Sequence, residues 1–161
     1  MTKKSRAALD EAFGVKTVLL NSDCVSAQSR ARLFWCNFPL LNLPREPDPA
    51  RTLVSVLEPM SAEFKQCKSQ AYVLTDRSLR RIRHTSTRAK SATLLASQNI
   101  LLDQRFRIPL VRYFHRHEME RLQTFPHGFC DALSPTKCQE ALGRAVTVEL
   151  VVLILKNIAN T

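Results

Sequence analysis

The hydrophobic positions of the chain predict a short N-terminal helix followed by two apolar strands. Residues 4–13 place one apolar side at helical spacing, and Gly14 follows as a helix-terminating glycine. That apolar side consists of Ala8, Leu9, Ala12 and Phe13. Two short runs, VKTVLL (15–20) and RLFWCNF (32–38), are then rich in β-branched and aromatic residues and predict strands. Four prolines between positions 39 and 49 indicate a linker after them.

The pattern of the C-terminal third predicts three helices. HEMERLQTFP (117–126) reads as a short helix stopped at Pro126. Ser134 and Pro135 indicate the start of a second helix that reaches Leu142 and ends at Gly143. The run VTVELVVLILKNI (146–158) suits a strand by its β-branched residues, but its length favours a buried helix. At 13 residues it is too short to span a bilayer.

The middle of the chain is less regular and carries the charge. AYVLTD (71–76) predicts a strand, and RRIRHTSTRAKS (80–91) predicts a polar loop. The 161 residues are 45% hydrophobic, enough for one domain with a core, yet the formal net charge is +10. The excess lies between Lys65 and Arg116, where twelve Lys and Arg occur with two acids. This charge favours a polyanionic partner, with nucleic acid ahead of a membrane surface.

The residues that the chain lacks exclude most kinds of autonomous enzyme. Its three glycines, Gly14, Gly128 and Gly143, cannot build a glycine-rich phosphate or nucleotide loop. The histidine and cysteine spacings match no zinc site, so we expect no metal, and no GxSxG or HExxH occurs. The five cysteines are odd in number and never in CxxC spacing. They predict reduced thiols in a cytoplasm, nucleoid or nucleus, and not a secreted protein.

One segment suggests a specific function. In VSAQSRARLFWCNFP (25–39), Gln28, Arg30 and Arg32 stand at alternate positions directly before the single tryptophan. In a strand, residues two apart share a face, so both guanidiniums would point the same way, as a clamp or as a solvated edge. The pattern Q-x-R-x-R resembles motif VIII of the DNA cytosine-5 methyltransferases, in the form typical of their de novo (type 3) group and its phage and bacterial relatives.

Further motifs of this family follow in the expected order. EMERLQTFPHGF (118–129) resembles motif IX, and ALGRAVTVEL (141–150) resembles motif X. Between motifs VIII and IX, IRHTSTRAKS (82–91) is similar to the target-recognition loop of the de novo group. Ordered motifs at plausible spacing support the resemblance better than any single motif, and together they cover residues 15–158.

The resemblance implies an α/β fold of which only a part is present. That part is the C-terminal portion of a Rossmann-like S-adenosylmethionine-dependent methyltransferase domain with a small basic target-recognition domain. The expected divisions are the end of the methyltransferase sheet with motif VIII (1–44), the target-recognition domain (45–111), and motifs IX and X returning to the core (112–161). The glycine-rich cofactor loop, the Pro-Cys nucleophile and the Glu-Asn-Val glutamate of the family are absent.

The resemblance also implies roles for individual residues. Arg30 and Arg32 would hold the flipped cytosine, one toward its O2 and one bracing the pocket, and Gln28 would orient the turn. Arg88 aligns with the arginine that reads the guanine of CpG, although a phosphate contact is an equal alternative. The other residues expected at DNA are Arg80, Arg81, Arg83, Thr87 and Lys90. In motif X, Arg144 and Val146 would close over S-adenosylmethionine, shared with the missing half.

A few conspicuous residues have structural interpretations. Glu118 and Arg121, three apart on the predicted helix, suggest a structural ion pair. His115, His117 and His127 are expected to be ordinary surface or satisfied residues.

Two functions remain open from the sequence. The first is the target-recognition part of a DNA cytosine-5 methyltransferase, with duplex DNA and a chain carrying motifs I to VI as partners and no membrane. The second is a non-catalytic DNA-binding or regulatory paralogue that stimulates a complete methyltransferase. With either function, this chain without a partner would have unpaired strand edges and only half of a hydrophobic core.

Overall fold

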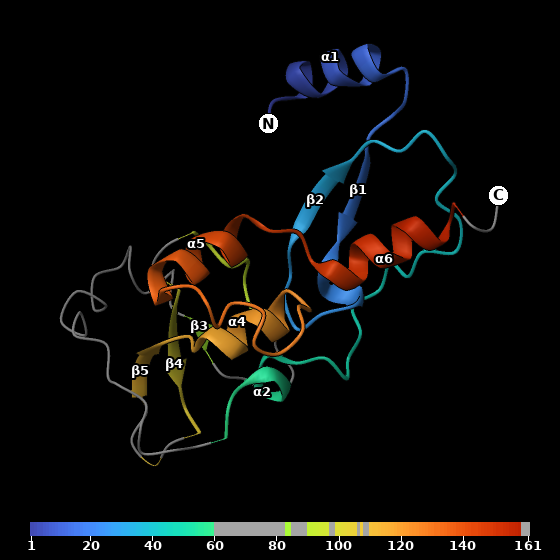
Figure 1. Ribbon diagram of the computed structural model, residues 1–161. Helices are drawn as coiled ribbons and strands as arrows, with labels where there is room; N and C mark the ends of the chain where they lie inside the picture. Colours follow the sequence, from blue (N-terminus) through green and yellow to red (C-terminus); the bar gives the residue numbers. More distant parts are fainter. Residues whose placement is uncertain (60–82, 85–89, 97–98, 106, 108–109, 159–161) are drawn as a thin grey trace.

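A computed structural model describes residues 1–59, 83–84, 90–96, 99–105, 107 and 110–158 (Figure 1). The predicted strand at 71–76 and most of the predicted loop at 80–91 lie outside these residues. The elements, in chain order, are α1 (Lys3–Phe13), β1 (Val18–Asn21), the 3₁₀ helix η1 (Ser22–Cys24), β2 (Ala31–Phe34), α2 (Leu53–Val56), β3 (Arg83–His84), β4 (Ile100–Asp103), β5 (Leu110–Tyr113), α4 (Arg116–Leu122), α5 (Pro135–Arg144) and α6 (Val148–Lys156).

The predicted N-terminal helix is confirmed as α1, but its apolar side is not buried. Gly14 ends it in the left-handed conformation, with a φ of 66° that favours glycine. The helix lies apart from the other elements (Figure 1), and Phe13 keeps 58% of its surface exposed. Polar contacts attach α1 instead, since Asp10 accepts hydrogen bonds from the Thr17 N–H and from Trp35 Nε1.

The two predicted strands are confirmed as an antiparallel hairpin, β1 and β2, covered by α6 (Figure 1). The run after Thr147 forms the predicted helix, α6, rather than a strand. Leu150 and Ile154 of α6 pack with Leu20, Cys24 and Val25 in one hydrophobic cluster. These side chains recur on one face of the helix, because residues four apart lie one turn above each other. Within the described residues, β1 pairs only with β2.

A second and larger cluster lies among β4, β5, α2, α4 and α5. In this region β3 pairs in parallel with β4, and β4 pairs antiparallel with β5. The buried residues of the cluster come from every predicted division of the chain: Ala27, Leu53, Leu57, Leu94, Leu101, Phe114, Met119, Leu122, Cys130, Cys138 and Leu142. The turn before β2, the end of the recognition segment and motifs IX and X therefore share one core.

A buried ion-pair network supports this core from the side of β4 and β5. Arg112 is only 1% exposed, and its guanidinium donates to both carboxylate oxygens of Glu118, each at 2.7 Å. It also donates to Asp103 Oδ2 at 3.0 Å, and Arg105 covers the same carboxylate from outside at 2.7 Å. Burial alone would raise the pKa of Asp103, but the hydrogen bonds from Arg105 and Arg112 outweigh it and hold that pKa below its usual value.

Helix α5 starts as predicted but continues past the predicted stop. Ser134 caps it by accepting from the Lys137 N–H, and Pro135 occupies its first turn. Gly143 lies inside the helix, which extends to Arg144. A Cβ at Gly143 would stand 2.3 Å from the carbonyl oxygen of Leu95, so this glycine is needed for a close backbone approach and not for a helix end.

The described cysteines form no disulfide bonds. Cys24, Cys36, Cys130 and Cys138 are free, and Cys67 lies outside the described residues. Burial, followed by a hydrogen bond with Cys130, raises the pKa of Cys138 to about 12, which makes it unreactive. None of the described helices is long and apolar enough to cross a membrane.

Gly143→Ala is expected to destabilise the protein by at least about 2 kcal/mol, because the added methyl group meets backbone atoms that cannot move aside. Gly14→Ala is the matched control, since it meets no atom within 4 Å and costs only about 1 kcal/mol for its left-handed φ. Urea unfolding measures both. Equal losses at the two positions would contradict the close approach at Gly143.

Arg112→Ala is expected to cost about 3–5 kcal/mol, because it leaves the Asp103 and Glu118 carboxylates buried without their shared cation. The matched control is Arg116→Ala, which removes an ion pair with the largely exposed Asp131 and should cost about 1 kcal/mol or less. Thermal and urea unfolding of the three proteins test this. A loss at Arg112 no larger than at Arg116 would show that the network does not stabilise the fold.

Candidate functional site

The turn that connects β1 to β2 carries the segment predicted as motif VIII, and almost all of it is buried. Hydroxyl groups shape it: Ser22 Oγ donates to the Gln28 carbonyl at 2.9 Å, and Ser26 Oγ accepts from the Gln28 N–H at 3.0 Å. Asn21 Oδ1 accepts from the Arg30 N–H at 2.7 Å. These local bonds satisfy the backbone of a buried turn that has no regular partner strand.

Gln28 connects this turn to two distant segments. Its side chain is fully buried, donates to the carbonyl of Leu122 in α4 at 3.2 Å, and accepts from the Leu94 N–H at 2.7 Å. The prediction that Gln28 orients its own turn therefore missed the contacts of its side chain with distant segments. The side chain links motif VIII to motif IX and to the end of the recognition segment, because an amide can donate and accept at once.

Arg30 is buried, with 4% of its surface exposed, and donates to three backbone carbonyls. They belong to Leu94 at 3.0 Å, Gly143 at 3.0 Å and Ala145 at 2.8 Å. Burial, with a smaller effect from Arg32, lowers the pKa of Arg30 to about 10, so the guanidinium stays charged at neutral pH. The side chain ties motif VIII to motif X through charge-assisted hydrogen bonds.

Arg32, two residues later on β2, lies in a different environment. Its side chain is exposed, and its guanidinium donates to the carbonyl of Ala31 at 2.7 Å. The two arginines therefore lie in different environments, one buried and one exposed. A clamp or a solvated edge would require both to lie in the same environment. The reason is that Arg30 precedes the first residue of β2 and is drawn into the core by three carbonyls, whereas Arg32 lies within the strand.

The end of the predicted recognition loop is joined to this turn through its backbone. Ser91 pairs with the motif VIII turn, since its N–H donates to Ala27 at 2.7 Å and its carbonyl accepts from Ser29 at 2.8 Å. Lys90 directs its ammonium group to the carbonyls of Ser26, Asp48 and Arg51 at 2.6–2.9 Å. Burial lowers the pKa of Lys90. All three ammonium donors are used inside the protein, and in this arrangement none remains for a phosphate.

Gln123, within the segment resembling motif IX, joins that helix to motif X. Its side chain is buried, donates to the Leu142 carbonyl at 2.7 Å and accepts from Thr147 Oγ1 at 3.0 Å. Its own carbonyl accepts from the Val148 N–H at 3.0 Å, which positions the start of α6. Motifs VIII, IX and X are thus connected pairwise by the side chains of Gln28, Arg30 and Gln123.

The two residues expected at the cofactor lie on the surface after this junction. Arg144 is 73% exposed in its side chain and pairs with Glu140 on α5 at 2.9 Å. Val146 is 48% exposed in the link between α5 and α6. Both side chains are therefore largely open to solvent.

The remaining predicted DNA contacts fall largely outside the described residues. Arg80, Arg81, Thr87 and Arg88 belong to this group. Arg83 forms the two-residue strand β3 with His84, of which only the backbone is described. Their predicted roles stay predictions.

Several basic residues that the charge pattern assigned to a polyanion have partners inside the protein. They are Lys90, Arg105, Arg112 and Arg116, held by backbone carbonyls or carboxylates. The predicted pair of Glu118 and Arg121 is also wrong in its partners, because Glu118 binds Arg112 and Arg121 binds Glu58. The sequence did contain a signal for the burial of Arg112. It stands two residues before the buried Phe114, and residues two apart in an extended chain share a face.

Comparison with known proteins finds structural similarity alone. No protein-family model matches the chain, and no curated protein matches its sequence. Among solved structures, the chain is similar to the methyltransferase EhMeth of Entamoeba histolytica, with 15% identity and a TM-score of 0.62 over 90% of this chain and 53% of that one.

Two further structures agree with this similarity. The Dnmt2 methyltransferase of S. pombe gives 17% identity and a TM-score of 0.57 over 86% of this chain and 55% of that one. A mutant DNMT2 of Spodoptera frugiperda gives 15% identity and a TM-score of 0.58 over 97% of this chain and 62% of that one. The chain therefore spans little more than half the length of these proteins, and its α/β fold is that of part of a methyltransferase domain.

Proposed function

We propose that this chain is the target-recognition and base-pocket part of a DNA cytosine-5 methyltransferase that methylates C5 of cytosine in duplex DNA, at CpG. Two independent observations support this proposal. The sequence motifs resemble those of the cytosine-5 enzymes in their order, and the fold is similar to part of several methyltransferase structures.

The observation that carries the proposal is the junction of the three motifs. Gln28 contacts Leu122, Arg30 contacts Gly143 and Ala145, and Gln123 contacts Leu142. Residues far apart in the sequence are joined there by side chains of the motif-like segments that bind one another's backbone, on top of the shared hydrophobic core. An unrelated sequence with chance motif matches has no reason to place them in one hydrogen-bonded unit.

Arg32 is the residue that we assign to the target base. A base must leave the duplex before a methyltransferase can act on it, and the flipped base is then held by hydrogen bonds to its edge. The guanidinium of Arg32 is exposed on β2, next to a turn that Arg30 and Gln28 hold rigid. Its fork of donors suits the O2 of cytosine, whose negative charge grows when C6 is attacked.

The cofactor and the nucleophile belong to the proposed second half. S-adenosylmethionine would supply the methyl group, and Arg144 and Val146 would cover one side of it from this chain. The Pro-Cys nucleophile and the assisting glutamate of the family do not occur in the sequence. A separate chain, or a longer form of this one, would therefore complete the active site.

Arg30 does not help to distinguish a catalytic part from a regulatory paralogue. Its contacts are structural, so a non-catalytic copy would need it equally for folding. Co-purification separates the two functions: a partner that lacks motifs IX and X supports a split enzyme, and a partner with all motifs supports the regulatory alternative.

Duplex binding by this chain is expected to weaken steeply with salt, and Arg88→Ala should remove about 1–3 kcal/mol of preference for CpG over TpA duplexes, because the TpA step has no guanine in either strand. Arg81→Ala is the matched control: loss of one phosphate contact should weaken binding to both duplexes and reduce the salt slope by about 1. Fluorescence anisotropy at several salt concentrations measures both effects. A preference unchanged by Arg88→Ala would remove that residue from base reading.

Arg32→Ala is expected to lower methyl transfer by roughly 10²-fold when this chain is combined with a methyltransferase N-terminal half, because one donor to the reacting base is lost. Thermal stability should not change, since the side chain is exposed. The matched control is Arg45→Ala, an equally exposed arginine outside the motif. Transfer of a labelled methyl group to CpG duplexes provides the rate, and a rate equal to that of the control would contradict the proposed role.

A further inference from the structure

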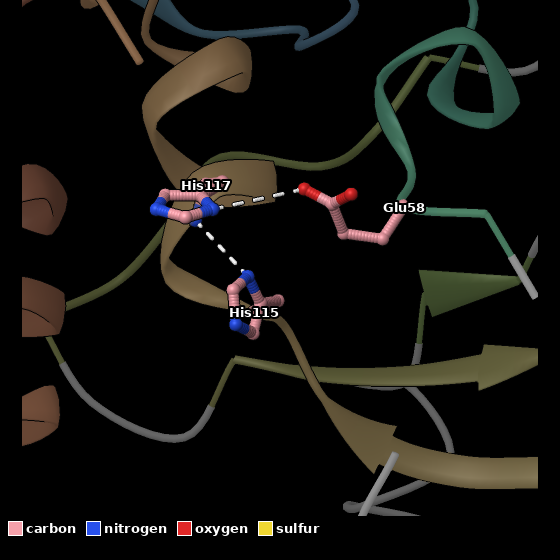
Figure 2. A group of neighbouring side chains, drawn as sticks. All are labelled: Glu58, His115 and His117. Atoms are coloured by element: carbon pink, nitrogen blue, oxygen red, sulfur yellow. Dashed lines mark hydrogen bonds and ion pairs between the residues drawn. The ribbon is translucent and has the colours of Figure 1, made fainter. Parts of the chain in front are cut away.

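Three of the four histidines of the chain gather at the start of α4 beside a carboxylate. Figure 2 shows Glu58, from the segment after α2, facing His117 in the first turn of the helix, while a ring nitrogen of His115, directly before the helix, points toward His117. One ligand atom from each of these three residues lies within 4.8 Å of the others. The group lies outside the motif junction, and the proposed function does not use it.

His117 is oriented as a metal ligand would be. Its Nε2 lies 3.2 Å from Asp131 Oδ1, and its Nδ1 lies 3.9 Å from Glu58 Oε1. A proton on Nε2 that is donated to Asp131 leaves the lone pair of Nδ1 directed toward Glu58. A carboxylate behind the distal nitrogen is the usual support of a metal-binding histidine, because it sets the tautomer and makes the ligand more basic.

The other two ligands have their backbones held in place. The Glu58 N–H donates to Glu118 Oε1 at 3.0 Å, and the Glu58 carbonyl accepts from Arg105 at 2.9 Å. The His115 N–H donates to Glu118 Oε2 at 2.8 Å. Glu118 of the buried ion-pair network thus positions both ligands, so little conformational entropy remains to be lost when a metal binds.

The nearby charges are compatible with a cation. The carboxylates of Glu58 and Asp131 both lie near the ring nitrogens of His117. Arg121 donates to Glu58 Oε1 at 2.7 Å, the same oxygen that lies 3.9 Å from His117 Nδ1, so a metal would displace this arginine or bind the second carboxylate oxygen. Arg116 is turned toward the Asp131 carbonyl at 3.2 Å. The hydrogen bond from the His117 N–H to His115 Nδ1 is long, at 3.4 Å, so little is lost when that nitrogen binds a metal.

We propose that Glu58, His115 and His117 form a Zn²⁺ site. Two imidazoles and one carboxylate are an established zinc ligand set, with water in the fourth position. Zinc bound at about 2.1 Å in a tetrahedron has ligand atoms about 3.4 Å apart, so these side chains would have to move closer together when the ion binds. The ion would fix the segment after α2 against α4. The histidine spacing alone did not indicate this site, because Glu58 reaches it only through the tertiary fold.

The site is tested by isothermal titration of the 161-residue chain with Zn²⁺, and by the absorption spectrum with Co²⁺. We expect one ion per chain, a tetrahedral Co²⁺ spectrum, and a higher unfolding temperature in the presence of zinc. His117→Ala and Glu58→Gln should each weaken binding by at least about 10-fold. The matched control is His127→Ala, whose ring stacks on His117 at 4.0 Å but is not in the ligand set, and it should stay within about 2-fold.

Either of two results would overturn the site. One is the absence of stoichiometric binding by the unmodified chain. The other is an equal loss of affinity in His127→Ala and His117→Ala, which would mean that zinc binds loosely to surface histidines. Circular dichroism without metal checks that each variant is folded. If His117→Ala is unfolded, Glu58→Gln decides, because it removes one charge and keeps the shape of the side chain.

Discussion

The buried guanidinium of Arg30 is the interaction on which the arrangement of this protein depends. It brings the chain around Leu94 against the chain around Gly143 and Ala145, through three carbonyls that no other described cation contacts. The same two segments approach so closely that position 143 has no room for a Cβ. The guanidinium of Arg30 and the absence of a Cβ at Gly143 therefore both allow the same close contact between these segments. Loss of the guanidinium would remove a charged donor from all three carbonyls and leave Ala145 with the longer bond from Gln123 Nε2 at 3.4 Å.

The positive charge of the chain has two different uses. Arg112, Arg105 and Lys90 neutralise carboxylates or cap carbonyls inside the fold, and they are not available to an external polyanion. Arg32, in the segment that resembles motif VIII, is exposed and can offer guanidinium donors to an external group. A count of basic residues therefore overstates the surface that could meet DNA, even where the choice of partner is right.

The fold also carries apolar surface that the described residues do not cover. Leu19 on β1 is 61% exposed, and Val152 and Leu155 on α6 are 42% and 53% exposed. The chain spans little more than half the length of the methyltransferases that it is similar to. The second half that we propose would bury these side chains and give β1 a neighbouring strand.

Local residue patterns were sufficient to predict α1, the two strands and the starts of α4, α5 and α6, because caps, prolines and periodicity act within one or two turns. The motifs were also visible in the sequence, since their residue types are what the family requires. Three features could not be predicted from the sequence. Arg30 is buried while Arg32 is exposed, Lys90 binds carbonyls inside the protein, and Glu58 lies close to His115 and His117. Each depends on carbonyls or carboxylates brought from distant segments, and only tertiary packing places those groups within hydrogen-bond or ligand distance.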